Sequence, residues 1–533
     1  MEPADPARAA DIIAGMGPVG AMLATLLGSR GVSVVVIEPQ DGPWPKPRAA
    51  VLETEAIRAL AVLPGLPPLE AWATPLARNG VVGADHRPLL MIEQTATAYG
   101  HPQAVRIDQP ALERGLWAAA AATGWVRILA GRSVRGVEQA GGQVTALLDD
   151  GERVTGQWLV GCDGTGSTVR AAAGIDFPGE TYPYPWLVVD ALVRPGAEAG
   201  SSADAGPAAE AGAGADAGPG VGGAVDGGAG IAFVLDPARP AVAMSQRDRW
   251  RWEWMLGPGE DPRAMTSDDT VRALISGWVP PDRLEVERAG VFTFHARTAG
   301  RWRSGRVLLA GDAAHAMPPF AGLGLGMGIR DAVALAWRLA DVVTAGADPL
   351  LLDGYERERR PDVERATRLA ARIGRLAQTR KPFTSRLVRG MLRAVAALPR
   401  IGTTLGAKPL PARRLPRTAA GPLPGAGRVL PNPRVSVGGG PPVRLDEVIG
   451  YRWACIGHAC DPRSGAGDLP PGAVLLAVDL PDPAPGCLPV TDLDGLLAGR
   501  PGSVTVVRPD RFLHGVLAHR GRLARGAAGR LPA

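Results

Sequence analysis

The segment at 15–20, Gly-Met-Gly-Pro-Val-Gly, constrains the fold of this chain more than any other feature. It follows an apolar run at 12–14 that predicts a buried strand, and it leads into a helix-like stretch at 19–29. A second predicted strand at 32–37 is closed by Glu38. Glycines let such a turn approach a pyrophosphate, the helix N-terminus attracts its charge, and the acidic residue can bind ribose hydroxyls. The sequence therefore predicts a βαβ unit that binds a dinucleotide.

Two further strand-to-turn segments lie far along the chain. The strand-like run at 158–160 leads into a glycine-containing turn at 161–170, and the run at 307–309 leads into another at 311–322. Because three such strand ends are distant in sequence, we expect one sheet assembled from separated segments. Between them, residues 181–290 contain several strand-like runs, which predict a second, β-rich domain.

Composition excludes several other classes of protein. Hydrophobic residues make up 46% and charged residues 21% of the 533, as in ordinary globular proteins, and this length predicts roughly two to four domains. The basic residues behind the net charge of +5 are spread along the chain, so we expect no nucleic-acid partner. No apolar run approaches the roughly 18 residues of a membrane span, and no export signal is visible. A cytoplasmic protein without a membrane partner is predicted.

The chain shows no pattern for a metal site. Its four cysteines have neither metal-ligand spacing nor a Cys-x-x-Cys pair, and its seven histidines do not cluster with them. We therefore expect reduced thiols and no bound metal. The segment at 196–230 is almost wholly Ala, Gly, Ser, Asp, Glu and Pro, too poor in apolar residues to offset chain entropy, and it is predicted to be a disordered insertion.

The two later turns distinguish the kinds of dinucleotide site. Gly-Cys-Asp-Gly-Thr-Gly-Ser-Thr-Val-Arg at 161–170 and Gly-Asp-Ala-Ala-His-Ala-Met-Pro-Pro-Phe-Ala-Gly at 311–322 resemble the later signatures of FAD-dependent aromatic hydroxylases of the p-hydroxybenzoate hydroxylase type. Further segments look like the branch that contains 3-(3-hydroxyphenyl)propionate hydroxylase, phenol hydroxylase and aromatic polyketide hydroxylases. These segments are 47–49, 106–113, 328–332, 355–361 and 508–511.

The resemblance implies an α/β fold with three parts. These are a Rossmann-like FAD-binding domain assembled from separated segments, a β-sheet-rich substrate domain and a C-terminal thioredoxin-like domain. Without a Cys-x-x-Cys pair, the last domain would have a structural or interface role. The predicted boundaries are FAD-binding at 10–72, 102–180 and 291–345, substrate domain at 73–101 and 181–290, a helical region at 346–422 and the thioredoxin-like domain at 423–533.

The resemblance also assigns residues to FAD. Glu38 and the first glycine turn would hold the ADP half. Arg48 and Gln109 would approach the pyrophosphate and the ribityl region, and Asp312 would bind a ribitol hydroxyl. Asp163 is assigned to a turn that family members use for domain packing and for nicotinamide-side contacts. The predicted cofactor-binding residues are Gly15, Gly17, Pro18, Val19, Gly20, Glu38, Arg48, Gln109, Asp163, Gly311, Asp312, Pro319, Gly322, Leu323, Gly324 and Leu325.

The glycine-rich turn at 322–326 precedes a helix that is predicted from Gly328 onward. Its backbone N–H groups and the positive helix end would face the pyrimidine side of the flavin and stabilise the negative charge of the reduced ring. The family commonly has Gln, Asn and Ser where this chain has Leu323, Gly326 and Met327. Side-chain contacts to the ring at these positions are therefore not expected, whereas backbone contacts are.

The resemblance implies a monooxygenase that consumes NADH or NADPH and O2. FAD would be held non-covalently, and a flavin C4a-hydroperoxide would transfer oxygen to a small phenolic substrate similar to 3-(3-hydroxyphenyl)propionate. No catalytic side chain is identified, because core packing explains Tyr182, Tyr184 and His295 at least as well as a role in phenol activation.

Several alternatives stay open. The same scaffold serves aromatic polyketide hydroxylases and Baeyer–Villiger monooxygenases of secondary metabolism. The departures at 323 and 326–327 also leave a non-catalytic flavin-binding protein as an alternative. A homodimer stays open beside a monomer.

Overall fold

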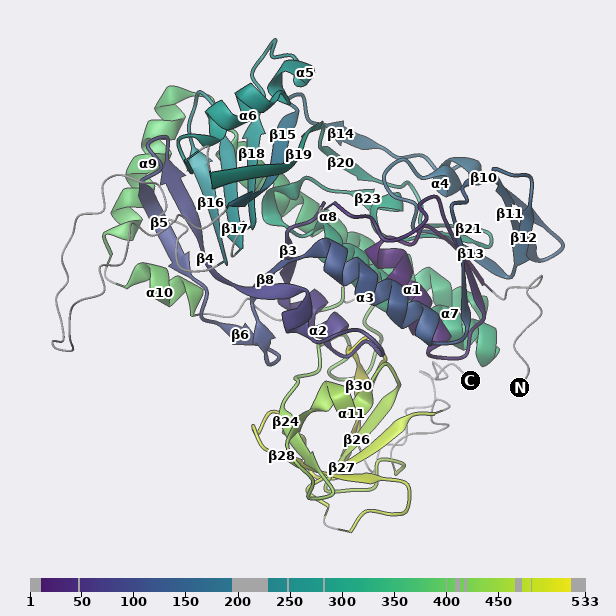
Figure 1. Cartoon of the computed structure of the whole chain (residues 1–533). Helices are drawn as coiled ribbons and strands as arrows, with labels where there is room; N and C mark the ends of the chain where they lie inside the picture. Colours follow the sequence, from purple (N-terminus) through teal and green to yellow (C-terminus); the bar gives the residue numbers. More distant parts are fainter. Residues whose placement is uncertain are drawn as a thin grey trace, which may run out of the picture.

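The computed structural model describes most of the chain between Asp11 and Ala518 (Figure 1). The described residues are 11–46, 48–193, 229–246, 249–280, 283–398, 400–407, 413–416, 419–464, 472–480 and 482–518. The predicted insertion at 196–230 lies outside the described residues except for its last two, which begin a strand. Pro47, in the family-like segment at 47–49, also lies outside them.

Segments far apart in sequence form one six-stranded sheet. Across the sheet the strands are β21 (Arg303–Ser304), β22 (Val307–Leu309), β13 (Trp158–Gly161), β1 (Asp11–Ala14), β2 (Val34–Glu38) and β9 (Val126–Ala130). β1 pairs in parallel with both β2 and β13, and β13 pairs in parallel with β22. The strands that precede the three glycine-containing turns therefore lie in one sheet, as the sequence predicted, and because they are parallel the turns follow the same ends of the strands. Every residue of β1, β2, β13 and β22 is buried, as in parallel strands covered on both faces.

Helices and a small antiparallel sheet pack on these strands. Helix α1 (Pro18–Gly28) contacts both α3 (Gln109–Ala122) and α7 (Gly324–Thr344), and the three lie side by side in Figure 1. The small antiparallel sheet, made of β10 (Val134–Ala140), β11 (Gln143–Leu148) and β12 (Arg153–Gly156), contacts β1 and β13. It adds Val144, Ala146 and Leu148 to the main core. The remaining elements of this region are α2 (Thr54–Ala61), α4 (Thr168–Ala172), β14 (Gly179–Thr181), β20 (His295–Thr298) and β23 (His315–Ala316).

A second, larger sheet has nine strands. In order they are β19 (Leu284–Phe292), β15 (Trp186–Val193), β18 (Arg249–Met255), β17 (Ala241–Gln246), β16 (Ala229–Leu235), β4 (Ala73–Gly83), β8 (Ala104–Ile107) and β3 (Val51–Glu53), with β5 (Pro88–Glu93) paired to β4. Apolar residues of one face pack against α5 (Pro262–Met265) and α6 (Asp268–Ile275). Strands β3 and β8 carry this sheet into segments that were predicted to be FAD-binding.

Three helices follow the two sheets. α8 (Asp353–Ala377) contacts α7, whereas α9 (Pro382–Ala396) and α10 (Ile401–Gly406) contact β5. On α9, Val388 packs with Leu89 and Leu235, but Leu387 and Met391 are exposed. Only part of the apolar stripe of α9 is therefore buried in the protein body.

The last part of the chain forms a separate seven-stranded sheet with its own core (Figure 1). Its strands, in order, are β25 (Val443–Arg444), β24 (Arg434–Val437), β28 (Leu488–Asp492), β27 (Val474–Val478), β26 (Ala454–His458), β29 (Ser503–Val507) and β30 (Leu513–Ala518), and α11 (Leu445–Ile449) follows β25. It contacts the rest of the protein through buried groups: the rings of Trp337 and Trp453 meet edge to face, and Arg58 donates to both carboxylate oxygens of Asp446.

One sequence prediction about the elements is wrong in detail. Helix α7 begins at Gly324 and not after Gly328, so part of the predicted glycine-rich turn is the first helical turn. Glycine in a first turn is tolerated because its N–H has no intrahelical acceptor and the following apolar stripe is buried.

Within the described ranges, no helix combines the length and apolar character needed to cross a membrane, and no three His, Cys, Asp or Glu side chains are placed to hold a metal ion.

Candidate functional site

A cavity between the six-stranded sheet and the large sheet brings together many of the predicted cofactor-binding residues. Its wall includes the first turns of α1 and α7, the start of α3 and the inner face of β17 and β18. The predicted residues on its wall are Gly17, Pro18, Val19, Arg48, Gln109, Asp312, Pro319, Gly322, Gly324 and Leu325. The other predicted residues, Gly15, Gly20, Glu38, Asp163, Gly311 and Leu323, do not line it.

The three glycines of the first turn have different roles. Gly15 has a φ of +96°, and a Cβ there would lie 2.5 Å from the carbonyl oxygen of Cys162. A Cβ on Gly20 would collide with the carbonyl oxygen of Gly15. A Cβ on Gly17, in contrast, would meet no protein atom within 4 Å. Gly17 lines the cavity, so there is open space beside it. Gly15 and Gly20 therefore shape the turn, and Gly17 keeps room for a bound group.

Two helix N-termini border the cavity without side-chain caps. Gly17 precedes α1 and Leu323 precedes α7, and neither makes a side-chain hydrogen bond to the first helical turn. The early N–H groups of a helix lack intrahelical acceptors, and the helix dipole places positive charge there. Both ends are thus arranged to accept negative charge, such as that of a pyrophosphate or of a reduced flavin ring.

Gln109 fixes the loop that carries Arg48. Its side-chain Oε1 accepts hydrogen bonds from the backbone N–H groups of Arg48 and Ala49 at 2.8 and 2.5 Å, and its Nε2 donates to Glu113 at 2.6 Å. Asp108 caps the start of α3 by accepting from Ala111 N–H at 3.1 Å. Gln109 therefore lies at the cavity both as a wall residue and as the support of the Arg48 backbone.

A buried ionic network supports the turn that presents Asp312. Asp331 accepts hydrogen bonds from Gly311 N–H at 3.1 Å and from Arg359 Nε at 2.8 Å, and its Oδ2 lies 2.6 Å from His315 Nε2. His315 is thus a packed, fully buried residue and is not on the cavity wall. The Asp312 side chain is exposed within the cavity, although the protein around it desolvates the carboxyl group and raises its pKa.

Two predicted acidic residues make structural contacts. Glu38 accepts from the backbone N–H of Met16 at 2.6 Å and of Gln40 at 3.0 Å. Asp163 accepts from Ser167 Oγ at 2.5 Å and from Val169 N–H at 3.0 Å, at the start of α4. Both carboxylates therefore stabilise turns beside the cavity.

Sequence reasoning missed the cavity residues contributed by the large sheet. Met244 of β17 and Arg251 and Glu253 of β18 line the cavity opposite the glycine turns. The strand Arg-Trp-Arg-Trp-Glu-Trp at 249–254 carried a signal, because charged and aromatic residues alternate. The rings of Trp250, Trp252 and Trp254 stack on one another, so the alternate residues lie on the other face.

This arrangement defines a dinucleotide-binding protein of the Rossmann type, with the cavity closed by a second sheet. Comparisons with known proteins agree. Residues 8–370 match the family described as FAD binding domain, and residues 427–527 match the one described as HcaD C-terminal domain. The chain belongs to the FAD binding domain family and to its aromatic hydroxylases.

Curated relatives are similar over nearly the whole chain. The chain is 33% identical to 3-(3-hydroxy-phenyl)propionate/3-hydroxycinnamic acid hydroxylase of Klebsiella pneumoniae (strain 342), over 96% of this chain and 92% of that protein. Among solved structures it resembles the flavin-dependent monooxygenase PieE, with a TM-score of 0.74, 22% identity and 97% coverage of both chains. It also resembles the OxyS anhydrotetracycline hydroxylase from Streptomyces rimosus, with a TM-score of 0.68, 25% identity and 96% coverage of both.

The protein is therefore an FAD-dependent monooxygenase, with NAD(P)H as reductant and O2 as co-substrate. The site fits FAD on its own geometry: Gly17 leaves space beside an uncapped helix N-terminus, and Asp312 presents an exposed carboxyl group further along the same wall. When bound, FAD would supply hydride acceptance and oxygen activation, which no protein side chain can provide.

Proposed function

We propose that this monooxygenase hydroxylates the ring of a phenolic acid similar to 3-(3-hydroxyphenyl)propionate. One observation carries the proposal: a single cavity runs from the α1 turn at Gly17, past Asp312 and Leu325, to Met244 and Glu253 on the large sheet. A dinucleotide at the first end would place its reactive ring toward the second end, where a substrate could lie against the sheet. The curated relative named for this phenolic acid, 33% identical over 96% of the chain, supports the choice of substrate class.

The proposed contacts to FAD follow from the position of each residue. Gly17 and the α1 N-terminus would hold the pyrophosphate, with Arg48 beside it, and Asp312 would accept a ribitol hydroxyl. The first turn of α7 would support the flavin ring through its backbone. Gly15, Gly20 and Gly311 would act by shaping the turns, and Glu38 would hold the ADP ribose from beside the cavity. The full proposed set is Gly15, Gly17, Pro18, Val19, Gly20, Glu38, Arg48, Gln109, Asp163, Gly311, Asp312, Pro319, Gly322, Leu323, Gly324 and Leu325.

The chain's own side chains would prepare the substrate end. Met244 and Leu325 exclude water from the wall, whereas Glu253 presents a carboxyl group. Burial raises the pKa of Glu253, which brings a carboxylate closer to the basicity needed to accept a phenol proton. Neither Tyr182 nor His295 lines the cavity: Tyr182 packs against Phe320, and His295 lies 3.0 Å from Thr181. Glu253 is therefore the proposed acceptor of the phenol proton.

Substrate-dependent reduction tests this function. NAD(P)H oxidation is expected to be slow without an aromatic ligand and to accelerate at least about tenfold with 3-(3-hydroxyphenyl)propionate, because occupancy shifts the enzyme toward its reducible conformation. The product should gain the mass of one oxygen atom. The matched ligand 3-phenylpropionate lacks the hydroxyl group and should not be hydroxylated. The proposal would be contradicted if no phenol tried changed the rate of NAD(P)H oxidation and hydrogen peroxide were the only product.

A larger substrate is the second candidate. The OxyS structure, 25% identical, is of an anhydrotetracycline hydroxylase, and its fold covers 96% of both chains. The same assay includes a fused-ring polyketide beside the phenolic acid. Faster reduction with the polyketide than with the acid would favour that substrate class.

Three finer features are proposed on the same basis. The domain boundaries given above are supported by the separate sheets except at β3 and β8, which belong to the large sheet but lie in segments assigned to the FAD-binding domain. A thioredoxin-like C-terminal domain is supported by the parallel strands β26, β27 and β28. The four described cysteines are free thiols, which supports a cytoplasmic location. A homodimer is supported by the exposed apolar side chains of Phe383, Leu387 and Met391, and sedimentation would test it.

A further inference from the structure

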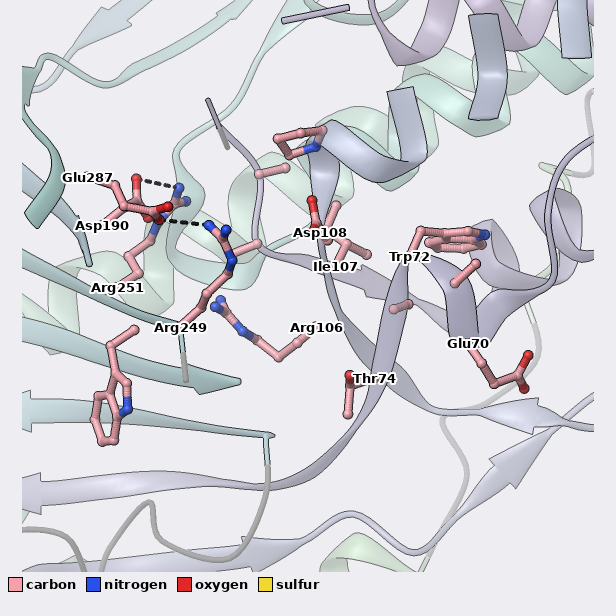
Figure 2. Close-up of a pocket in the computed structure, with 16 residues that line it drawn as sticks. Glu70, Trp72, Thr74, Arg106, Ile107, Asp108, Asp190, Arg249, Arg251 and Glu287 are labelled. Carbon is pink, nitrogen blue, oxygen red and sulfur yellow. Dashed lines mark hydrogen bonds and ion pairs between the residues drawn. The ribbon is translucent and has the colours of Figure 1, made fainter. Parts of the chain in front are cut away.

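A second cavity lies against the same sheet and adjoins the FAD cavity. The two cavities share Ala49, Ala50 and Arg251 on their walls. Arg106 enters the second cavity from β8, and Figure 2 shows its guanidinium group lying toward the arginines of β18, Arg249 and Arg251. Only 5% of Arg106 is exposed. A nearly buried cation therefore lies where the substrate end of the FAD cavity meets its neighbour.

The other cations of the second cavity have anionic partners. Arg249 donates to Glu287 at 2.7 Å, and Arg251 donates to both oxygens of Asp190 at 2.7 and 3.1 Å (Figure 2). Arg251 also donates to the carbonyl oxygen of Arg48 at 2.8 Å. These two guanidinium groups are thus already neutralised by the protein.

Arg106 has no comparable partner among the described residues. Its Nη1 approaches only the thioether sulfur of Met244, at 3.2 Å, and its buried Nε has no hydrogen-bond acceptor. A thioether is a weak acceptor and carries no charge. The carboxylates of Asp190 and Glu253 attract Arg106 electrostatically, but no hydrogen bond joins either of them to it. Arg106 is therefore nearly buried, its Nε has no acceptor among the described residues, and its Nη1 contacts only an uncharged sulfur.

Burying a charged guanidinium group costs free energy unless an anion pairs with it. Burial and the positive charge of Arg251 lower the pKa of Arg106 to about 9, so the group is still protonated at neutral pH. An unpaired buried charge destabilises the folded protein, and a bound anion would relieve that cost. The planar guanidinium fork matches a carboxylate, to which it can donate two parallel hydrogen bonds.

We propose that Arg106 binds the carboxylate of the aromatic substrate, with the thioether of Met244 forming the boundary toward the ring. The assignment rests on the proposed function and adds to it the residue that would select an acid over a neutral phenol, because a neutral phenol would leave Arg106 without an anionic partner. Met244 lines the FAD cavity and touches Arg106, so a substrate whose ring lies beside Met244 has its acidic side chain at Arg106.

The test compares an acid with a neutral analogue on the FAD-loaded enzyme. Binding of 3-(3-hydroxyphenyl)propionate and of 3-ethylphenol is measured by the change in the flavin absorption spectrum, in wild type, Arg106→Gln and Arg106→Lys. Arg106→Gln should weaken binding of the acid about 10- to 100-fold, as expected for loss of a charged hydrogen bond, and leave binding of 3-ethylphenol nearly unchanged. Arg106→Lys should recover part of the affinity for the acid, because it keeps the charge without the fork.

Arg249→Gln is the matched control. Arg249 lines the same cavity and carries the same charge, but Glu287 already neutralises it, so binding of the acid should change little. FAD content and thermal unfolding of each variant show whether it is folded.

The outcomes separate the two proposals. Equal weakening of the acid and of 3-ethylphenol in folded Arg106→Gln would overturn the carboxylate site. An unchanged acid affinity with weaker NADPH binding would also overturn it, because the anion at Arg106 would then be a cofactor phosphate. If neither compound accelerates NAD(P)H oxidation in the wild type, the proposed function fails, whereas a difference confined to Arg106→Gln concerns the anion site alone.

Discussion

At the scale of single residues, Gly15 and Gly17 differ in what their lack of a side chain does for the turn. The positive φ of Gly15 and its closeness to the Cys162 carbonyl oxygen leave no room for a side chain. Gly17 has ordinary backbone angles and open space beside it. The same Gly-x-Gly pattern thus contains one glycine that the turn requires and one beside which the protein leaves open space.

Replacing Gly17 by Leu should empty the site and keep the fold. The new side chain meets no protein atom at Cβ but occupies the space of the pyrophosphate, so the ratio of flavin to protein absorbance should fall to near zero. Far-UV circular dichroism should stay unchanged. Gly390→Leu, the same change at an exposed site of α9, should retain full flavin. Wild-type flavin content in Gly17→Leu would show that the pyrophosphate lies elsewhere.

Replacing Gly15 by Ala should, in contrast, reduce the stability of the fold itself. The strained φ and the contact with Cys162 should reduce the free energy of unfolding by about 1–3 kcal/mol or more. Urea unfolding measures this difference. A stability equal to that of wild type would mean that the turn relaxes to accept a side chain.

At the scale of elements, Asp331 connects three parts of the FAD region. It lies on α7, bonds to Arg359 of α8 and accepts the backbone N–H of Gly311 at the end of β22. Burial raises the pKa of Asp331, but His315 and Arg359 lower it more, so the pKa lies below its ordinary value and the group is ionised at neutral pH. A single carboxylate therefore holds the turn of Asp312 in place relative to two helices.

Asp331→Asn should reduce stability by about 3–5 kcal/mol, because it leaves Arg359 partly unpaired in the interior. Flavin content should fall in parallel as the Gly311 turn loosens. The matched control is Asp268→Asn, which removes an exposed pair with Arg272 and should change stability by less than about 1 kcal/mol. Denaturant unfolding distinguishes the two, and similar shifts in both variants would contradict a special role for Asp331.

At the scale of the whole molecule, the C-terminal sheet is fastened to the FAD region by buried charges. Asp446 of α11 accepts two hydrogen bonds from Arg58 of α2 and lies 3.0 Å from Arg511. Burial raises the pKa of Asp446, but Arg511 and Arg58 lower it more, so its pKa lies below the ordinary value. The unfolded chain binds a proton at this group more readily than the folded one.

The stabilising effect of Asp446 should therefore be present at neutral pH and be lost as the pH falls below about 4, through the unfolded and then the folded pKa. Asp446→Asn should cost about 3–5 kcal/mol at pH 7 and make stability less dependent on pH below about 4. Urea unfolding across this range measures both effects. Asp494→Asn, at an exposed pair with Arg434, should have the smaller effect at neutral pH. Parallel pH profiles for wild type and Asp446→Asn would contradict this account.

The sequence alone determined the parts of the site that depend on short segments. A glycine turn between a strand and a helix depends on backbone angles within a few residues, so pattern and resemblance were enough to assign residues 15–20 and Asp312 to one site, and Gly17 and Asp312 do line one cavity. The order of the three turns also predicted one sheet, because each apolar strand can be buried only beside another. The start of α7 was misplaced by one turn because glycines there indicate a loop and a helical first turn equally.

Only the tertiary structure decided which residues lie across the cavity from the glycine turns. Arg106, Met244 and Glu253 are brought together by pairing among β3, β4, β8, β16, β17 and β18, whose register is set by contacts across the large sheet. The alternation in β18 predicts two faces but not which face meets the cavity. Whether a buried arginine finds a protein carboxylate, as Arg251 does, or lacks one, as Arg106 does, depends on distances between strands that no local pattern contains.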